Sequence, residues 1–89
     1  MMKRVPRKFK NRVLEVVAAI PKGSVLTYKE VARRAGNPQA CRAVGNIMSR
    51  NRDPGVPCHR VVRSDGTVGG YAWGTEKKIE RLRSEGAIS

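Results

Sequence analysis

Cys58 is the side chain of this sequence best suited to covalent chemistry, because a thiolate is the strongest protein nucleophile near neutral pH. It lies between Pro57 and His59, the only histidine of the chain. An imidazole can accept the thiol proton, but in an extended strand the two side chains would point to opposite faces, so a bend or a bridging water is needed. The alternative is that Cys58 is buried and inert, as single cysteines often are.

Glu85 is the acidic residue most suited to assist His59, since a histidine base needs a carboxylate to fix its tautomer. We expect it at the end of a helix, where the helix dipole disfavours a negative charge by about 0.3–1 kcal/mol. A compensating hydrogen bond is therefore expected, although Glu85 as a plain surface residue is the alternative. No metal or other cofactor is predicted, because Cys41, Cys58 and His59 are only three ligands and lack CxxC spacing.

The composition favours one small domain with an anionic partner. Residues 1–89 are too few for two globular domains, and 19 Lys and Arg against 7 Asp and Glu give a net charge of +12. Such a charge favours an anionic partner, and nucleic acid leads. The longest apolar stretch, 16–21, is far shorter than the ~20 residues of a membrane span, so we expect a cytoplasmic protein without membrane contact, with Cys41 and Cys58 as thiols.

The N-terminal third predicts a basic amphipathic helix. Apolar residues recur at helical spacing from Pro6 to about Pro21, and Gly23 is placed as a left-handed cap. The basic residues of its start suit either a solvated helix face or a phosphate-binding arm. They are Lys3, Arg4, Arg7, Lys8, Lys10 and Arg12.

The middle of the chain predicts a helix-turn-helix. Thr27-Tyr28-Lys29-Glu30 has the form of a capping box, and this helix stops at Gly36. Asn37-Pro38 then predicts a third helix, from Pro38 to about Arg50. Its apolar stripe is expected to contain Ala40, Cys41, Val44, Ile47 and Met48. Its outer face, Arg42, Gly45, Asn46 and Ser49, is small and polar and suits close approach to a nucleic acid backbone.

The C-terminal part predicts a loop, a β-hairpin and a helix. Prolines and glycines make 51–57 irregular, Asp65-Gly66 favours a hairpin between 59–63 and 67–69, and a last helix runs from Thr75 to Glu85, buries Ile79 and Leu82, and ends at Gly86. The predicted fold is therefore mainly α: a small helical domain with a helix-turn-helix, winged-helix-like, and a short β-hairpin.

The motifs together resemble a known family. Pro57-Cys58-His59-Arg60-Val61, with Arg42-Ala43-Val44-Gly45 before it and Gly70-Tyr71 and Glu85-Gly86 after it, closely resembles the DNA-binding, active-site domain of the O6-alkylguanine-DNA alkyltransferases. The resemblance runs from about Phe9 to Gly86. It implies a monomeric DNA-repair methyltransferase that flips O6-alkylguanine out of double-stranded DNA and moves the alkyl group, once and irreversibly, to Cys58.

The resemblance also implies roles for individual residues. His59 is expected to be the water-mediated base, Glu85 the acid that orients it, and Asn51 the brace of the active-site turn. Arg42 is expected to replace the flipped base and Tyr28 to crowd the phosphate, while Gly45, Asn46 and Ser49 contact DNA through the minor groove. The substrate pocket is expected to be lined by Val61, Tyr71, Ala72 and Trp73, with Tyr71 as a hydrogen-bond donor near the base.

Three features depart from the family pattern, and three rival functions stay open. The family's N-terminal domain is expected to be absent, Trp73 is expected to narrow the range of alkyl groups, and the 51–58 loop is about one residue short.

The closest rival is the alkyltransferase-like class, which binds the lesion without repair and in which tryptophan or alanine usually replaces the cysteine. A plain helix-turn-helix binder is disfavoured because base-reading side chains are scarce on the 42–49 face. A Cys-His hydrolase is disfavoured because no substrate cleft or oxyanion motif is evident.

Overall fold

Four α-helices and a minimal sheet make up the computed structural model, which describes residues 7–65, 67–71 and 73–88. The order of elements is α1 (Arg7–Ala18), β1 (Leu26–Thr27), α2 (Tyr28–Arg34), α3 (Cys41–Arg50), the 3-10 turn η1 (Cys58–Arg60), β2 (Val61–Val62) and α4 (Thr75–Ser84). The mainly helical fold predicted from the sequence is confirmed.

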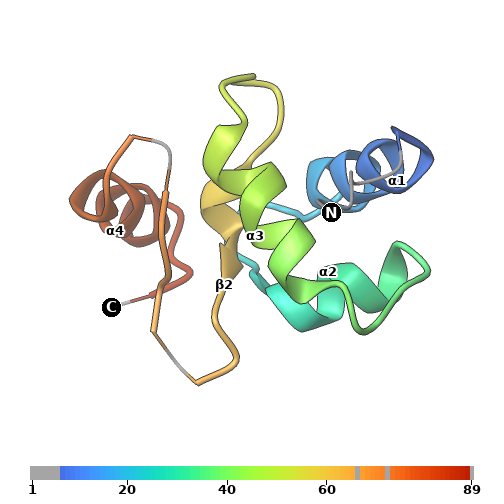
Figure 1. Cartoon of the computed structure of the whole chain (residues 1–89). Helices are drawn as coiled ribbons and strands as arrows, with labels where there is room; N and C mark the ends of the chain where they lie inside the picture. The colour runs from blue at the N-terminus through green and yellow to red at the C-terminus, as the bar shows by residue number, and fades with distance from the viewer. Residues whose placement is uncertain (1–6, 66, 72, 89) are drawn as a thin grey trace.

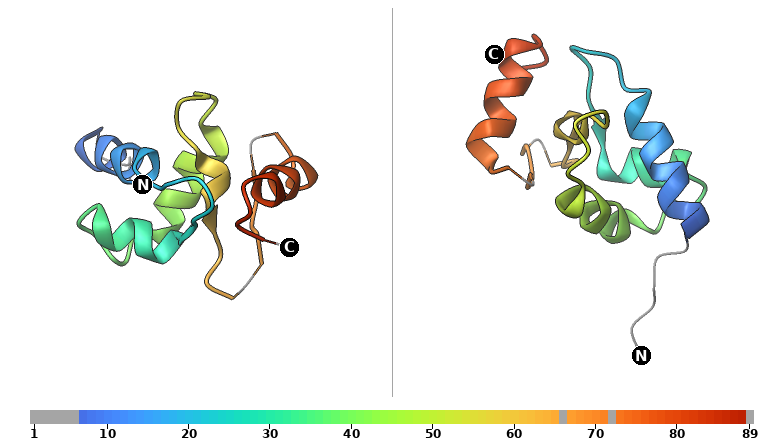
Figure 2. Two further views of the ribbon diagram at one scale, coloured as in Figure 1. Left: turned by 180° about the vertical axis from the view of Figure 1, so that it is seen from behind. Right: turned by 90° about the horizontal axis from the view of Figure 1, so that it is seen from above.

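The turn η1 lies at the centre of the arrangement. Helices α1 and α2 lie on one side of it and α4 on the other, with α3 packed against α1 and α2 (Figures 1 and 2). The core between these elements consists mostly of aliphatic side chains, as expected of a chain with few aromatic residues. Its buried members are Val13, Val17, Ile20, Val31, Ala32, Ala35, Val44, Ile47, Met48, Cys58 and Val61.

The start and end of α2 follow from local sequence signals. The Thr27 hydroxyl accepts a hydrogen bond from the Glu30 N–H (3.0 Å), which is one half of the predicted capping box. The carboxylate of Glu30 binds Arg33 and Arg34 rather than returning to the cap. At the other end, Gly36 has a φ of +100° and the Asn37 N–H reaches the Ala32 carbonyl (3.0 Å), so the chain closes α2 with a Schellman turn.

Two predicted helix boundaries were wrong. Helix α1 ends at Ala18, and Gly23, with a φ of +88°, belongs to the following turn, in which the Ser24 N–H donates to the Pro21 carbonyl. Its predicted start at Pro6 lies outside the described residues. Helix α3 begins at Cys41 instead of Pro38.

A separate turn explains the late start of α3. The side chain of Asn37 accepts from the Gln39 N–H (3.3 Å), and its carbonyl accepts from the Ala40 N–H (3.1 Å). These bonds use the Asn37 groups in a local turn, as asparagine often does. Cys41 is consequently exposed rather than part of the buried stripe, whereas Val44, Ile47 and Met48 are buried as predicted.

The predicted β-hairpin is replaced by a turn and a parallel pairing. Among the described residues, the arms at 59–63 and 67–69 share the bond from the Arg63 N–H to the Thr67 carbonyl (3.0 Å), while Gly66 lies outside them. Strand β2 pairs in parallel with β1, with Leu26 opposite Val61. The first arm is also shorter than predicted, because η1 occupies residues 58–60.

No helix of the described segments combines the length and the apolar character that a bilayer crossing requires.

Two glycines give opposite expectations for the same substitution. Gly36→Ala should lower the free energy of unfolding by about 1 kcal/mol or more, because an L-residue in the left-handed region is strained. The added Cβ would also lie 3.0 Å from an Arg12 guanidinium nitrogen. Gly45→Ala should raise the free energy of unfolding by up to about 1 kcal/mol, because Gly45 lies within α3 and the added Cβ would meet no atom within 4 Å. Urea unfolding of both variants checks this pair, and equal effects would contradict it.

Candidate active site

Cys58 is held in a tight turn at the edge of the core. The turn η1 is closed by the Arg60 N–H donating to the Pro57 carbonyl (2.9 Å), and the Cys58 N–H donates to the Val56 carbonyl (2.8 Å). The side chain of Cys58 is almost fully buried, and the cysteine is a free thiol. The bend that a Cys58–His59 relay requires is therefore present, because these residues lie in a 3-10 turn and not in a strand.

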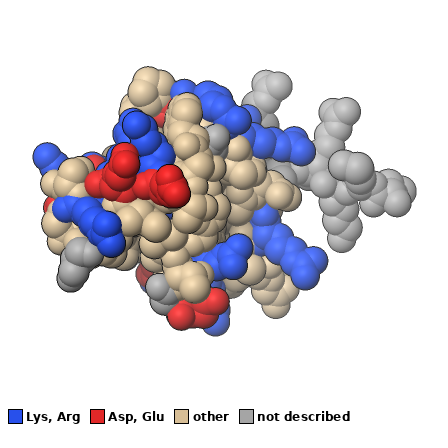
Figure 3. Space-filling model, turned by 90° about the vertical axis from the view of Figure 1, so that its left-hand side faces the viewer, with Lys and Arg blue, Asp and Glu red and all other residues tan. Residues whose placement is uncertain are grey.

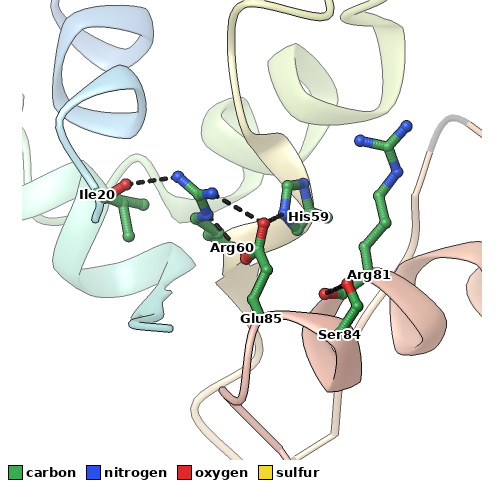
Figure 4. A network of polar contacts seen from close by, with 6 residues as sticks. All are labelled: Ile20, His59, Arg60, Arg81, Ser84 and Glu85. Carbon is green, nitrogen blue, oxygen red and sulfur yellow. Dashed lines mark hydrogen bonds and ion pairs between the residues drawn. The ribbon is translucent and has the colours of Figure 1, made fainter. Parts of the chain in front are cut away.

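A buried ion-pair cluster joins η1 to the end of α4 (Figure 4). Nε2 of His59 lies 2.9 Å from Oε2 of Glu85. Arg60 binds the same carboxylate through two hydrogen bonds, donating from Nε to Oε1 (2.9 Å) and from Nη2 to Oε2 (2.8 Å). The Glu85 side chain is only 10% exposed and the His59 side chain 5%. Because an ionised carboxylate only accepts hydrogen bonds, this geometry places a proton on Nε2 and leaves Nδ1 of a neutral ring as the acceptor.

The electrostatics of the cluster follow from Arg60. Its hydrogen bonds, followed by those of His59, lower the pKa of Glu85 to about 2, although burial opposes the shift. The same pairing raises the pKa of Arg60. The hydrogen bonds expected for a carboxylate at a helix C-terminus are thus present, and Glu85 is not a plain surface residue.

Lys78 is a second buried cation, and the sequence analysis did not single it out. Its side chain is fully buried, and Nζ donates to the carbonyls of Val61 (2.6 Å) and Gly70 (3.1 Å) and to the Tyr28 hydroxyl (3.5 Å). Burial lowers its pKa to about 8. The helical spacing would have revealed it, since Lys78 lies one turn before the buried Leu82 on the same stripe of α4.

The predicted site residues gather on two sides of η1. Tyr28, Arg42, Gly45, Asn46 and Ser49 line a groove of about 620 Å³ over α2 and α3, which Lys29 and Arg63 also border. A second cleft, of about 360 Å³, lies between η1 and α4. It is lined by His59, Tyr71, Trp73 and Glu85, with Arg60, Arg81 and the 53–57 loop.

The two tyrosines line different cavities, Tyr28 the groove and Tyr71 the cleft. Tyr28 begins α2, and its hydroxyl donates to the Gly70 carbonyl (3.4 Å). Tyr71 meets the His59 ring edge-on, with centroids 6.2 Å apart, and packs on Trp73 at 5.2 Å. Burial raises the pKa of both tyrosines, and a charge on Cys58 would raise it further. Each hydroxyl is therefore kept as a neutral donor.

The remaining predicted positions differ in how they relate to the site. The side chain of Asn51 forms a local turn with Asp53, accepting from its N–H at 3.3 Å, at the start of the loop that leads to Cys58. The side chain of Val61 is fully buried in the core, so it does not line an open pocket as expected. Trp73 is 44% exposed, with the Arg52 guanidinium 5.7 Å above its ring. Ala72 lies outside the described residues.

Comparison with known proteins places this geometry in context. A family model described as the DNA binding domain of 6-O-methylguanine DNA methyltransferase matches residues 8–87. The chain is 51% identical over 80 residues to the methylated-DNA–protein-cysteine methyltransferase of Methanothermobacter thermautotrophicus, covering 89% of this chain and 44% of that protein.

Two solved structures are similar over most of the chain. Mycobacterium tuberculosis OGT in complex with DNA superposes with a TM-score of 0.83 at 37% identity, over 92% of this chain and 50% of that one. S. pombe Atl1, in complex with damaged DNA containing O6-carboxymethylguanine, superposes with a TM-score of 0.83 at 36% identity, over 93% of this chain and 80% of that one. The chain thus spans half or less of the first two proteins and most of the third.

The Glu85 cluster should make the free energy of unfolding depend on pH in the acid range. The pKa of Glu85 is about 2 instead of 4.5, so its ionisation contributes about 3 kcal/mol to the free energy of unfolding. This contribution is complete above pH 4.5 and is lost as the pH falls toward 2. Glu85→Gln should therefore lower the free energy of unfolding at neutral pH and flatten its decline between pH 4.5 and 2. Urea unfolding at stepped pH measures this.

Glu80→Gln is a matched control for the loss of one carboxylate. Glu80 is exposed on α4, the helix that Glu85 follows, so its removal should leave the acid dependence nearly unchanged. An equally steep decline in wild type and Glu85→Gln would show that the cluster does not carry the acid sensitivity.

Proposed function

Because this chain belongs to the family of the 6-O-methylguanine DNA methyltransferases, of which it carries the DNA-binding domain, we propose that it repairs O6-alkylguanine in double-stranded DNA. The acceptor in this proposal is Sγ of Cys58. The observation that carries it is a buried thiol in the same tight turn as a His59–Glu85 pair, at 2.9 Å, in the sequence setting of methylated-DNA–protein-cysteine methyltransferases.

The proposed reaction is one displacement at carbon. His59 takes the Cys58 proton at Nδ1, directly or through a water, and Glu85 stabilises the imidazolium through Nε2. The thiolate then forms a bond to the alkyl carbon while the carbon–O6 bond breaks. The electron pair of the broken bond leaves with guanine, which is neutralised by the proton released from Cys58, passed on by His59 through water. Tyr71 and Tyr28, kept as neutral donors, are the candidate hydrogen-bond donors to the departing base. The thioether is stable, so each molecule reacts once.

The proposed DNA surface is the groove over α2 and α3, with these helices acting as a helix-turn-helix. Its exposed α3 face carries Arg42 near the helix start and Gly45, where open space surrounds the glycine. A base inside a duplex cannot reach a buried thiol, so the nucleotide must be flipped. Arg42 is long, planar and cationic and suits the vacated position in the base stack.

Charge supports DNA as the partner. The net charge is +12, and on the face drawn in Figure 3 the Lys and Arg side chains are spread over the surface rather than gathered in one patch. Such a surface binds phosphates without reading sequence. In this proposal residues 1–89 act as a single domain and a monomer, in the cytoplasm if the host is prokaryotic.

The second candidate function is lesion recognition without repair. It is favoured by the similarity to S. pombe Atl1 in complex with damaged DNA, at a TM-score of 0.83 and 36% identity. The presence of Cys58 argues for transfer, because a thiolate is the essential nucleophile.

Intact mass spectrometry separates the two functions. After incubation with an excess of duplex containing O6-methylguanine, the protein should gain the mass of one methyl group, located on Cys58, without turnover. Cys58→Ala should stay unmodified and still bind the lesion duplex, and Cys41→Ala is the matched control that should react like wild type. Unmodified wild-type protein that binds the lesion would favour recognition without repair.

Arg42 should affect the rate of alkyl transfer from duplex DNA but not from the free base. Arg42→Ala should slow single-turnover transfer from duplex DNA by tenfold or more, and transfer from free O6-alkylguanine base should change little, because a free base needs no flipping. Arg33→Ala, which removes an exposed arginine paired with Glu30 on α2, is the matched control. Equal slowing with both substrates would rule out the stacking role.

A further inference from the structure

The charge of Glu85 is divided between two partners. Oε1 accepts only from Arg60 among the bonds of the described residues, and Oε2 accepts from both Arg60 (2.8 Å) and His59 (2.9 Å). The guanidinium is charged at every accessible pH. The carboxylate that faces His59 is therefore already partly neutralised before the imidazole takes up a proton.

Arg60 is itself held in place. Its third donor, Nη1, binds the carbonyl of Ile20 just after α1 (2.8 Å), and its side chain is 16% exposed. Figure 4 shows the guanidinium spanning from Ile20 to the carboxylate. A side chain fixed at both ends keeps a constant geometry toward Glu85, because it cannot turn to solvent without losing all three bonds.

We propose that Arg60 is a positioning residue that withdraws part of the Glu85 charge from His59, so that His59 holds a proton less tightly and is available as a base. An unshared, buried carboxylate 2.9 Å from the ring would stabilise the imidazolium strongly and keep the base occupied. Arg60 reduces this effect and still leaves Glu85 ionised to orient Nε2–H. The role in transfer rests on the proposed function, whereas the effect on His59 protonation does not.

Other charged groups also face His59. They come from its own turn, from the loops on either side and from α4. The proposal requires that the effect of Arg60 on His59 exceed theirs, and the bidentate pair of Arg60 with Glu85 is the reason to expect this. The titratable and charged groups of the cleft and turn are Asp53, Cys58, Arg60, Tyr71, Arg81 and Glu85.

The test is an NMR titration of the DNA-free protein. His59 is the only histidine, so its ring C–H resonances need no assignment. In Arg60→Gln the midpoint should rise by about one pH unit relative to wild type, a tenfold gain in proton affinity. Arg81→Gln removes a charge from the same cleft without breaking the Arg60–Glu85 pair, and its midpoint should move much less.

A second variant covers a failure of Arg60→Gln to fold. Arg60→Lys keeps a charge but cannot form the bidentate pair, so its midpoint should rise by less than that of Arg60→Gln. In each folded variant, the acid limb of the single-turnover rate profile should move up with the NMR midpoint. A midpoint that stays or falls in either folded Arg60 variant overturns the proposal. A shifted midpoint in a protein that never transfers methyl would overturn the proposed function alone.

Discussion

The carboxylate of Glu85 is the group on which the geometry of the candidate site depends. It follows α4, binds two consecutive residues of η1 and, through Arg60, is connected to the backbone at the end of α1. Three segments that are far apart in the sequence therefore meet at one negative charge. A nine-tenths buried carboxylate is tolerated only when it is paired and hydrogen-bonded, so this requirement fixes where α4 can lie relative to η1.

Lys78 provides a second polar clamp in a chain with a small core. One ammonium binds the carbonyl of Val61 in β2, the carbonyl of Gly70 and the hydroxyl of Tyr28. The segment between β2 and α4 has no regular structure among its described residues, and Lys78 ties it to both neighbours. The side chains of two of the many cations, Arg60 and Lys78, thus point inward. Their hydrogen bonds stabilise loops and helix ends that the small aliphatic core packs only weakly.

Most of the features predicted from the sequence are set by a few neighbouring residues. The His59–Glu85 contact spans 26 positions and is an exception, because it was predicted from the need of a histidine base for a carboxylate and not from local spacing. The Thr27 cap and the glycine at position 36 act within one helical turn, and both are seen. The parallel pairing of Leu26 with Val61 was missed, because a two-residue strand has no periodicity and its partner is distant. Arg60 was quoted only as part of a motif, since its partner lies 25 positions away. The roles assigned by family resemblance to Cys58 and its neighbours stay predictions, although their placement together agrees with them.

Cys58 is among the lining residues of neither the groove over α3 nor the cleft beside α4, and this burial constrains the proposed chemistry. A charge on its sulfur would affect the pKa of Tyr28 on the groove side and of Tyr71 on the cleft side, so both hydroxyls lie within electrostatic reach of the thiol. The proposed transfer therefore requires that a path to the thiol open, because Cys58 is almost fully buried. Lys78 binds the carbonyl of Gly70, a residue that borders the groove. Lys78 thus fixes the backbone at this edge of the groove, and the glycine adds no side-chain atoms there, since even a Cβ at this position would meet open space.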